Sequence, residues 1–153
     1  MAMLIPLHDA AEKGDLKEID FLLKAGWDIN SNDYWAQTPL MWACVNGQLR
    51  TVKYLIKRGA NIELPNKWGE TPAFVAAKQK NKPILKFLIK NGANVNLKDA
   101  RGRSALFLKK ESAKSCLGRI YALHKELGCF LDNYNDDLDM ISILSEAGAI
   151  DEP

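Results

Sequence analysis

The sequence repeats itself with a period of 33 residues, and this feature constrains the fold more than any other. A Thr-Pro-Leu motif at 38–40 recurs as Thr-Pro-Ala at 71–73 and as Ser-Ala-Leu at 104–106. A second motif, which begins with glycine, recurs at 26–30, 59–63 and 92–96, with a further copy after a longer interval at 148–150. A fixed period of this size indicates a stacked array in which each unit contacts only its neighbours.

Each unit carries the signals of two short helices joined by a turn. Thr38 can cap a helix with its hydroxyl, and Pro39 fits the first helical position, where its missing N–H is harmless. Gly47 ends this first helix, and Gly59 ends the second. The second helix has an apolar stripe at helical spacing, formed by Leu49, Val52, Leu55 and Ile56. The polar stretch around Asn66 has turn chemistry and predicts a hairpin finger.

These residues resemble the ankyrin repeat family, which shares the Thr-Pro-Leu-His-x-Ala signature and the 33-residue period. The resemblance implies an all-α fold, a solenoid of stacked helix-turn-helix units with short hairpin fingers. We expect a single domain over 1–153, with a capping unit at 1–32 and further units at 33–65, 66–98 and 99–153. His8 matches the signature histidine and is expected to form a structural hydrogen bond.

The last unit is longer than the others. The interval from Gly92 to Gly148 is 56 residues, 23 more than one period, and we place the insertion at about 114–136. An amphipathic pattern predicts an extended or additional helix over about 105–127, followed by a loop at 132–137 and a final helix at 138–146. Two roles are open for this segment. It can cap the apolar face of the last repeat, which solenoids require, or serve as a partner-specific insertion.

The sequence has no motif for catalysis, so we predict no enzyme activity, no cofactor and no metal. His124 follows Cys116 by eight residues, about 12 Å along a helix, which is too far for a Cys–His nucleophilic pair. A zinc site formed by these two residues and Cys129 would lack a fourth ligand. The odd cysteine count and the lack of a signal peptide predict a reduced, cytoplasmic environment. No apolar run is long enough for a membrane helix, so we expect no membrane partner.

The ankyrin resemblance implies protein binding through a concave face made by the finger tips and the first helix of each pair. By position, the candidate binding residues on this face are Tyr34, Trp35, Gln37, Trp42, Lys67, Trp68, Glu70, Lys78, Arg101 and Arg103. Trp35 and Trp68 are one period apart, so we expect them side by side along the groove. Such side chains dominate binding hot spots, but they can also pack on neighbouring fingers. Trp27 is interpreted as local packing.

The charges are distributed unevenly along the chain. Residues 1–77 carry 8 basic and 9 acidic side chains, residues 78–125 carry 13 and 2, and residues 126–153 carry 8 acidic side chains and no basic ones. The middle block is either a solvated lysine-rich face beside an acidic tail or an electropositive surface for an acidic partner. Nucleic-acid binding through 78–125 is an alternative, although Trp35 and Trp68 lie outside this stretch.

We therefore expect a non-catalytic adaptor or steric inhibitor, monomeric when free, that binds a protein partner with an acidic surface through its concave groove. If the source is bacterial, an immunity or antitoxin-like protein and a host-directed effector are the alternatives. If the source is an animal, Asn30 resembles the substrate of an asparagine hydroxylase, because Leu22 precedes it by eight residues.

Overall fold

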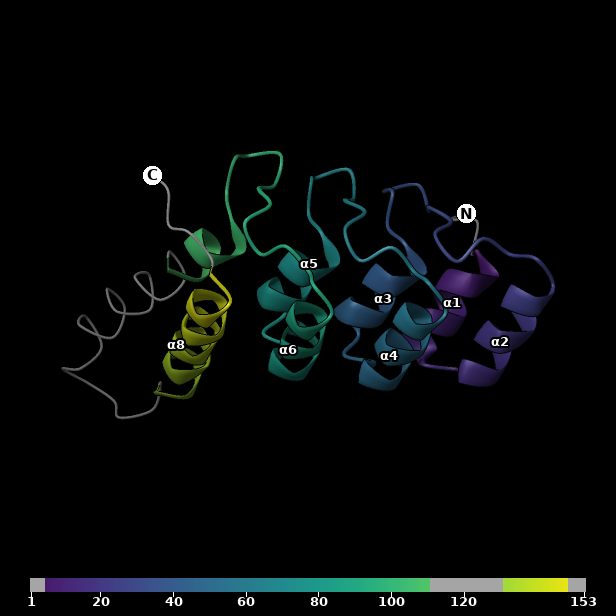
Figure 1. Ribbon diagram of the computed structural model, residues 1–153, viewed down its shortest axis with the longest axis horizontal. Helices are drawn as coiled ribbons and strands as arrows, with labels where there is room; N and C mark the ends of the chain where they lie inside the picture. Colours follow the sequence, from purple (N-terminus) through teal and green to yellow (C-terminus); the bar gives the residue numbers. More distant parts are fainter. Residues whose placement is uncertain (1–4, 111–130, 149–153) are drawn as a thin grey trace.

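The computed structural model describes residues 5–110 and 131–148, which form a row of helix pairs (Figure 1). The pairs are α1 (Pro6–Lys13) with α2 (Leu16–Lys24), α3 (Pro39–Val45) with α4 (Leu49–Lys57), and α5 (Pro72–Lys78) with α6 (Lys82–Lys90). Residues 105–110 are also helical, and α8 spans Leu131–Glu146. These described residues contain no strand, and the expected all-α repeat solenoid is confirmed. None of their helices is long and apolar enough to cross a membrane.

The inner helices, which are the first of each pair, start where the repeated hydroxyl residues stand. Thr38 and Thr71 each accept, through Oγ1, a hydrogen bond from the N–H three residues further on, at 3.3 and 3.4 Å. Ser104 does the same at 3.1 Å for the helix that begins at Ala105. These caps satisfy donors that a helix start would otherwise leave unpaired. Because α3 and α5 have only 7 residues each, their stability must come from packing as well.

Small side chains allow the inner helices to approach one another closely. Helix α1 packs on α3, and α3 packs on α5. The small buried residues at these contacts are Ala10, Ala11, Ala43, Cys44, Ala76 and Ala77. The outer helices, which are the second of each pair, add the larger apolar side chains Ile19, Leu22, Val52, Leu55, Ile84, Leu85 and Leu88. All of these residues belong to one continuous core.

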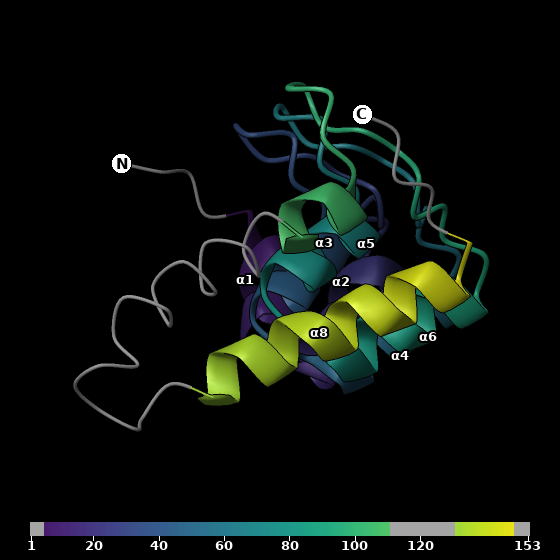
Figure 2. The ribbon, with the colours of Figure 1, turned by 90° about the vertical axis from the view of Figure 1, so that its left-hand side faces the viewer.

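Helix α8 extends this core at the C-terminal end of the row, where Met140 and Leu144 are fully buried (Figure 2). The expectation of a loop at 132–137 is wrong, because α8 begins at Leu131 and runs through it. Asp and Asn are weak helix formers, but burial of Met140 and Leu144 holds α8 against the core and outweighs local propensity. The expected extra helix begins at Ala105, and its continuation lies outside the described residues. The division into units, with the insertion at about 114–136, stays a prediction.

Hydrogen bonds between units fix the spacing of the row. Asn30 Oδ1 accepts from the N–H of Asn61 at 2.8 Å, and Glu63 forms the corresponding bond one repeat later at 2.7 Å. His8 Nε2 donates to the carbonyl of Gln37 at 2.9 Å, so the signature histidine has the structural role expected of it. As a result, the loops between the helix pairs lie over one another when the row is viewed along its length (Figure 2).

Candidate binding surface

Three hairpin fingers project from the same side of the helix row, at 33–37, 66–70 and 99–103 (Figure 1). Each finger is folded around the side chain of its first residue. Oδ1 of Asp33, Asn66 and Asp99 accepts hydrogen bonds from the N–H groups two and four residues further on, at 2.8–3.0 Å. The backbone of each finger is therefore held by a short polar side chain, as in other Asx-type turns.

The finger tips are also bonded to one another. The N–H of Lys67 donates to the carbonyl of Trp35 at 2.9 Å, and the N–H of Ala100 donates to the carbonyl of Trp68 at 2.7 Å. Gly69 permits the second of these contacts: its φ is +74°, and a Cβ there would lie 2.8 Å from the backbone nitrogen of Ala100. The three fingers therefore form one hydrogen-bonded row, and the side chains at their tips are held in a fixed order.

Aromatic rings stand exposed on the first two fingers. The exposed fractions are 78% for Tyr34, 40% for Trp35 and 48% for Trp68. Tyr34 and Trp35 contact each other edge to face, with ring centroids 5.8 Å apart, and Lys67 Nζ lies 3.7 Å from the centre of the Tyr34 ring. The backbone bond between the tips places Trp35 and Trp68 on adjacent fingers. Within the described residues, the ring-to-ring contact is between Tyr34 and Trp35, and not between the two tryptophans. These rings form an apolar patch at the N-terminal end of the finger row.

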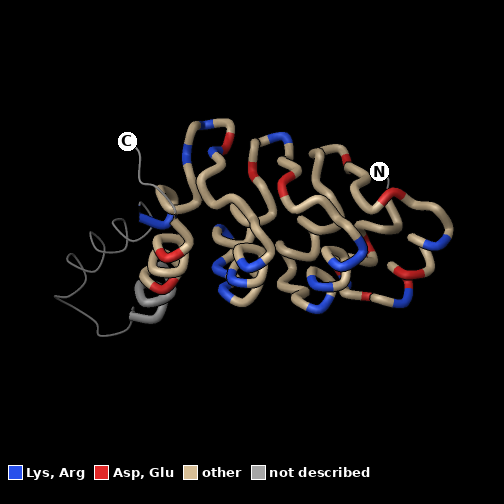
Figure 3. The backbone as a smooth tube through the Cα atoms, in the orientation of Figure 1, with Lys and Arg blue, Asp and Glu red and all other residues tan. Residues whose placement is uncertain are grey.

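Cationic side chains follow on the second and third fingers (Figure 3). Lys67 and Arg101 are exposed at the tips. Arg103 is held by Asp99, whose Oδ2 accepts from Nε at 3.0 Å and from Nη2 at 2.7 Å. Burial raises the pKa of Asp99, but the hydrogen bonds from Arg103 and from the N–H of Arg101 outweigh burial and lower the pKa below its usual value. The finger row thus changes from aromatic to cationic along its length.

Several predicted binding residues hold the surface in shape. Trp42 is half-buried, and its Nε1 donates to Asp33 Oδ2 at 3.0 Å. Glu70 is buried and accepts from Asn66 Nδ2 at 3.0 Å and from Lys78 Nζ at 2.7 Å. Gln37 is half-buried, and its carbonyl accepts the bond from the signature histidine. Of the predicted binding residues, the structure leaves six exposed: Tyr34, Trp35, Lys67, Trp68, Lys78 and Arg101.

Sequence reasoning missed Asp33 and Asp99, which organise two of the three fingers. The signal was present, because both lie one period away from Asn66, which had been assigned to a turn. Trp27, interpreted as local packing, is 40% exposed and lies in the loop after α2, outside the finger residues 33–37.

Two observations bear on metal binding and on thiol chemistry in the described residues. They contain no group of three His, Cys, Asp or Glu side chains that could hold a metal ion. Cys44 is fully buried, and burial raises the pKa of its thiol, which opposes formation of a reactive thiolate. Cys116, His124 and Cys129, considered above for zinc, lie outside the described residues.

Comparison with known families agrees with this architecture. A family model of ankyrin repeats, in three copies, matches residues 7–99. The match covers more than half of the sequence, and the chain belongs to the ankyrin repeat family. No curated protein matches the sequence. Ankyrin repeats are generally protein–protein interaction modules, and the family is typically non-catalytic.

Proposed function

We propose that this protein binds a protein partner through the finger row and the adjoining inner helices, and that it acts as a non-catalytic adaptor or steric inhibitor. The observation that carries the proposal is the patch of three exposed aromatic rings on hydrogen-bonded finger tips. Large exposed rings in a fixed arrangement bury much apolar area and lose little conformational entropy on binding. Free in the cytoplasm, the protein is a monomer with this surface open.

The charge pattern of the row supports a partner with an acidic surface. Lys67 and Arg101 extend from the tips beside the aromatic patch, whereas Asp33, Glu70 and Asp99 have internal hydrogen-bond donors. An acidic group of the partner would meet the cations without facing an exposed carboxylate at the tips. Electrostatic complementarity of this kind raises the association rate and selects among partners.

A protein partner is favoured over nucleic acid bound through 78–125. The exposed rings that could stack on bases lie on the first two fingers, outside that block. A bacterial immunity protein, an antitoxin-like protein and a host-directed effector all use the same kind of surface, and each would block or recruit one specific partner. The proposal does not depend on which of these roles applies.

The test compares Trp35→Ala combined with Trp68→Ala against Trp27→Ala, a control that removes a similarly exposed tryptophan from the loop after α2. Each protein captures partners from lysate of the source organism, with and without nuclease, and mass spectrometry identifies what is retained. The affinity of the captured partner is then measured with purified components. We expect the affinity of the double variant to fall by about a thousandfold, since hot-spot rings contribute about 2 kcal/mol or more each and two of them are removed.

Circular dichroism and urea unfolding show whether the double variant keeps the helical fold. Unchanged affinity in a folded double variant would overturn the proposal, as would an equal loss in the Trp27→Ala control. Loss of all captured material after nuclease treatment would replace the protein partner with nucleic acid.

A further inference from the structure

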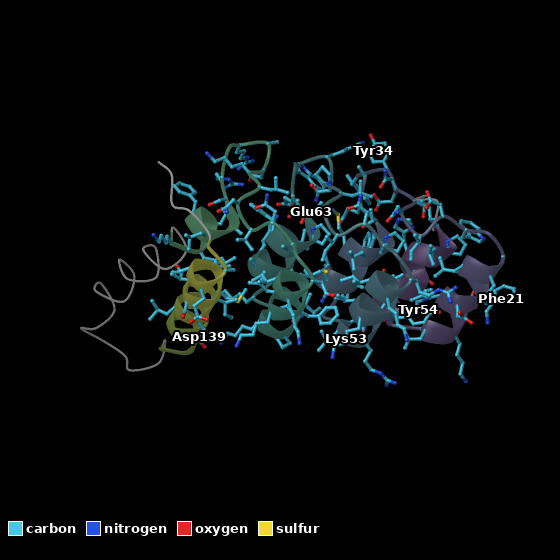
Figure 4. All side chains as sticks on the ribbon, in the orientation of Figure 1. Phe21, Tyr34, Lys53, Tyr54, Glu63 and Asp139 are labelled. Carbon is cyan, nitrogen blue, oxygen red and sulfur yellow. The ribbon has the colours of Figure 1, made fainter. Side chains whose placement is uncertain are left out.

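The side of the molecule opposite the fingers carries a repeated set of lysines on the outer helices. Lys53 and Lys57 of α4 stand one period before Lys86 and Lys90 of α6, and Arg50 lies one turn before Lys53. All five side chains are exposed. Figure 3 shows the basic residues along these helices, and Figure 4 shows Lys53 on the opposite side of the row from Tyr34. Neighbouring helices lie about 8–10 Å apart, so the four lysines form a compact square.

These five cations have no acidic counterpart in the described part of the chain. Arg50, Lys53, Lys57, Lys86 and Lys90 form no ion pair with any described residue, and the one contact of Lys53 is a cation–π contact with the Phe87 ring at 5.6 Å. By contrast, two cations on neighbouring elements are paired. On α2, Lys24 forms an ion pair with Asp20 at 2.6 Å. Lys82, the first residue of α6, forms an ion pair with Asp139 of α8 at 2.7 Å.

A hollow with an aliphatic floor lies directly beside the lysine square. It has a volume of about 390 Å³ between α6 and α8 and is lined by Lys86, Ile89, Lys90, Ile143, Glu146 and Ala147. Ile89, Ile143 and Ala147 are partly buried, so their outer surfaces can still accept an apolar group. Two of the unpaired lysines form one rim of this hollow, and the apolar floor and the positive charge are therefore continuous.

We propose that this outer face is a second docking surface, which binds an acidic amphipathic segment of a protein partner. An aliphatic side chain of that segment occupies the hollow between α6 and α8, and its carboxylates lie over the lysine square. Helical spacing of the lysines, at 53 and 57 and at 86 and 90, matches acidic side chains placed one turn apart on a facing helix. The surface is separate from the finger row and does not depend on the function proposed there.

The structure favours this partner over other polyanions. The floor of the hollow is aliphatic, whereas bases stack on aromatic rings, and the Phe87 ring is half-buried beneath Lys53. Glu146 of α8, which also lines the hollow, would repel phosphates of a nucleic acid or an anionic lipid surface at the edge of the patch. A protein segment can place its acidic residues on the lysine side and keep the other side neutral.

The probe is a fluorescein-labelled helical peptide of about 16 residues, with leucines on one face, glutamates on one flank and neutral residues on the other flank. Two matched peptides have every glutamate replaced by glutamine, or every leucine by alanine. Binding to the full chain is followed by fluorescence anisotropy, with a short duplex DNA and phosphatidylserine vesicles as the competing polyanions. We expect the first peptide to bind tightest, with an affinity that falls as salt is added.

Protein variants locate the binding site. Lys86→Gln with Lys90→Gln, and separately Lys53→Gln with Lys57→Gln, should each weaken the peptide about tenfold, whereas Lys13→Gln with Lys17→Gln on the first repeat makes the same charge change and should have little effect. Ala147→Gln fills the hollow, so this variant should bind the leucine peptide and the alanine peptide with equal affinity. Circular dichroism confirms that each variant folds.

Several outcomes would overturn the proposal. One is failure of the leucine–glutamate peptide to bind, and another is equal binding of the glutamine peptide. If the first-repeat control loses as much peptide affinity as the Lys86→Gln, Lys90→Gln variant, the effect of charge is non-specific. Tighter binding of DNA or vesicles than of the peptide would assign the face to that polyanion instead. The Trp35 and Trp68 variants should bind the peptide like the wild type, so failure here is distinguishable from failure of the finger-row proposal.

Discussion

Replacement of Asp99 tests how the third finger is held. Asp99 is buried, and its side chain accepts four hydrogen bonds: two from backbone N–H groups through Oδ1 and two from the Arg103 guanidinium through Oδ2. One repeat earlier, Asn66 accepts the same two backbone bonds through its own Oδ1. Asp99→Asn should therefore keep the two backbone bonds through Oδ1. Its Nδ2 would face the Arg103 guanidinium, whereas Nδ2 of Asn66 donates to Glu70, so the substitution removes the charge and both bonds from Arg103.

The magnitudes follow from these bonds. Each hydrogen bond to the backbone contributes about 1 kcal/mol to the free energy of unfolding, and an ion pair at this partly exposed site contributes about 1 kcal/mol. Asp99→Ala loses all of them and should lower the free energy of unfolding by about 3 kcal/mol. Asp99→Asn loses mainly the ion pair with Arg103 and should cost about 1 kcal/mol.

Urea unfolding followed by tryptophan fluorescence and by circular dichroism measures both variants. The pKa of Asp99 is lowered in the folded protein, so its ionised form stabilises the fold above the unfolded value of about 4, and this contribution is lost as the pH falls through the folded pKa. The difference between wild type and Asp99→Asn should therefore shrink in acid. Equal costs for the alanine and asparagine variants, or a difference independent of pH, would refute this account of the finger.

Three further predictions concern the repeat and its ends. Thr71→Ala should lower the free energy of unfolding by about 1 kcal/mol, whereas Thr71→Ser should cost less, because Ser104 caps the next inner helix in the same way; urea titration checks both. Ala36 has a φ of +56° where later fingers carry glycine, so Ala36→Gly should stabilise the protein by about 0.5 kcal/mol, and a lower melting temperature would contradict this. Burial lowers the pKa of His8, and its Nδ1 has no hydrogen-bond partner. The free energy of unfolding should therefore decrease as the pH falls below about 6.5, and His8→Gln should remove the part of this decrease that His8 causes.

The sequence was sufficient to predict the repeat fold because each local signal agrees with the global one. Threonine caps, the glycine after each outer helix and the apolar stripes all recur with one period, so the array could be assigned without any long-range information. The prediction failed at 132–137, where Asp and Asn propensities indicated a loop and α8 is helical instead. Local propensity is a weak guide wherever a helix is also held by burial, as α8 is through Met140 and Leu144.

The sequence predicted where the residues of the candidate surface lie, but not which of them face a partner and which hold the backbone in place. The period placed Trp35 and Trp68 on adjacent fingers, but it could not show that Glu70 is buried against Lys78 or that Trp42 bonds to Asp33. Whether a polar side chain faces a partner or holds its own backbone depends on distances of about 3 Å, which sequence spacing does not specify. The period of the lysine square was visible in the sequence, but its lack of ion pairs within the described residues could be seen only from the positions of the acidic side chains there.

The arrangement of the two surfaces bears on the choice between adaptor and inhibitor. The fingers project from one side of the row, and the lysines of α4 and α6 lie on the other, so a partner on the finger tips leaves the outer face uncovered (Figure 3). Hydrogen bonds between the tips fix the finger row, so a ligand on the outer face should not change the shape of the fingers. Two ligands should therefore bind independently and simultaneously, as an adaptor requires. A steric inhibitor needs only the fingers, and for it the charge reversal Lys86→Glu with Lys90→Glu would leave inhibition unchanged. Retained partner binding with loss of a ternary complex in that variant would identify an adaptor.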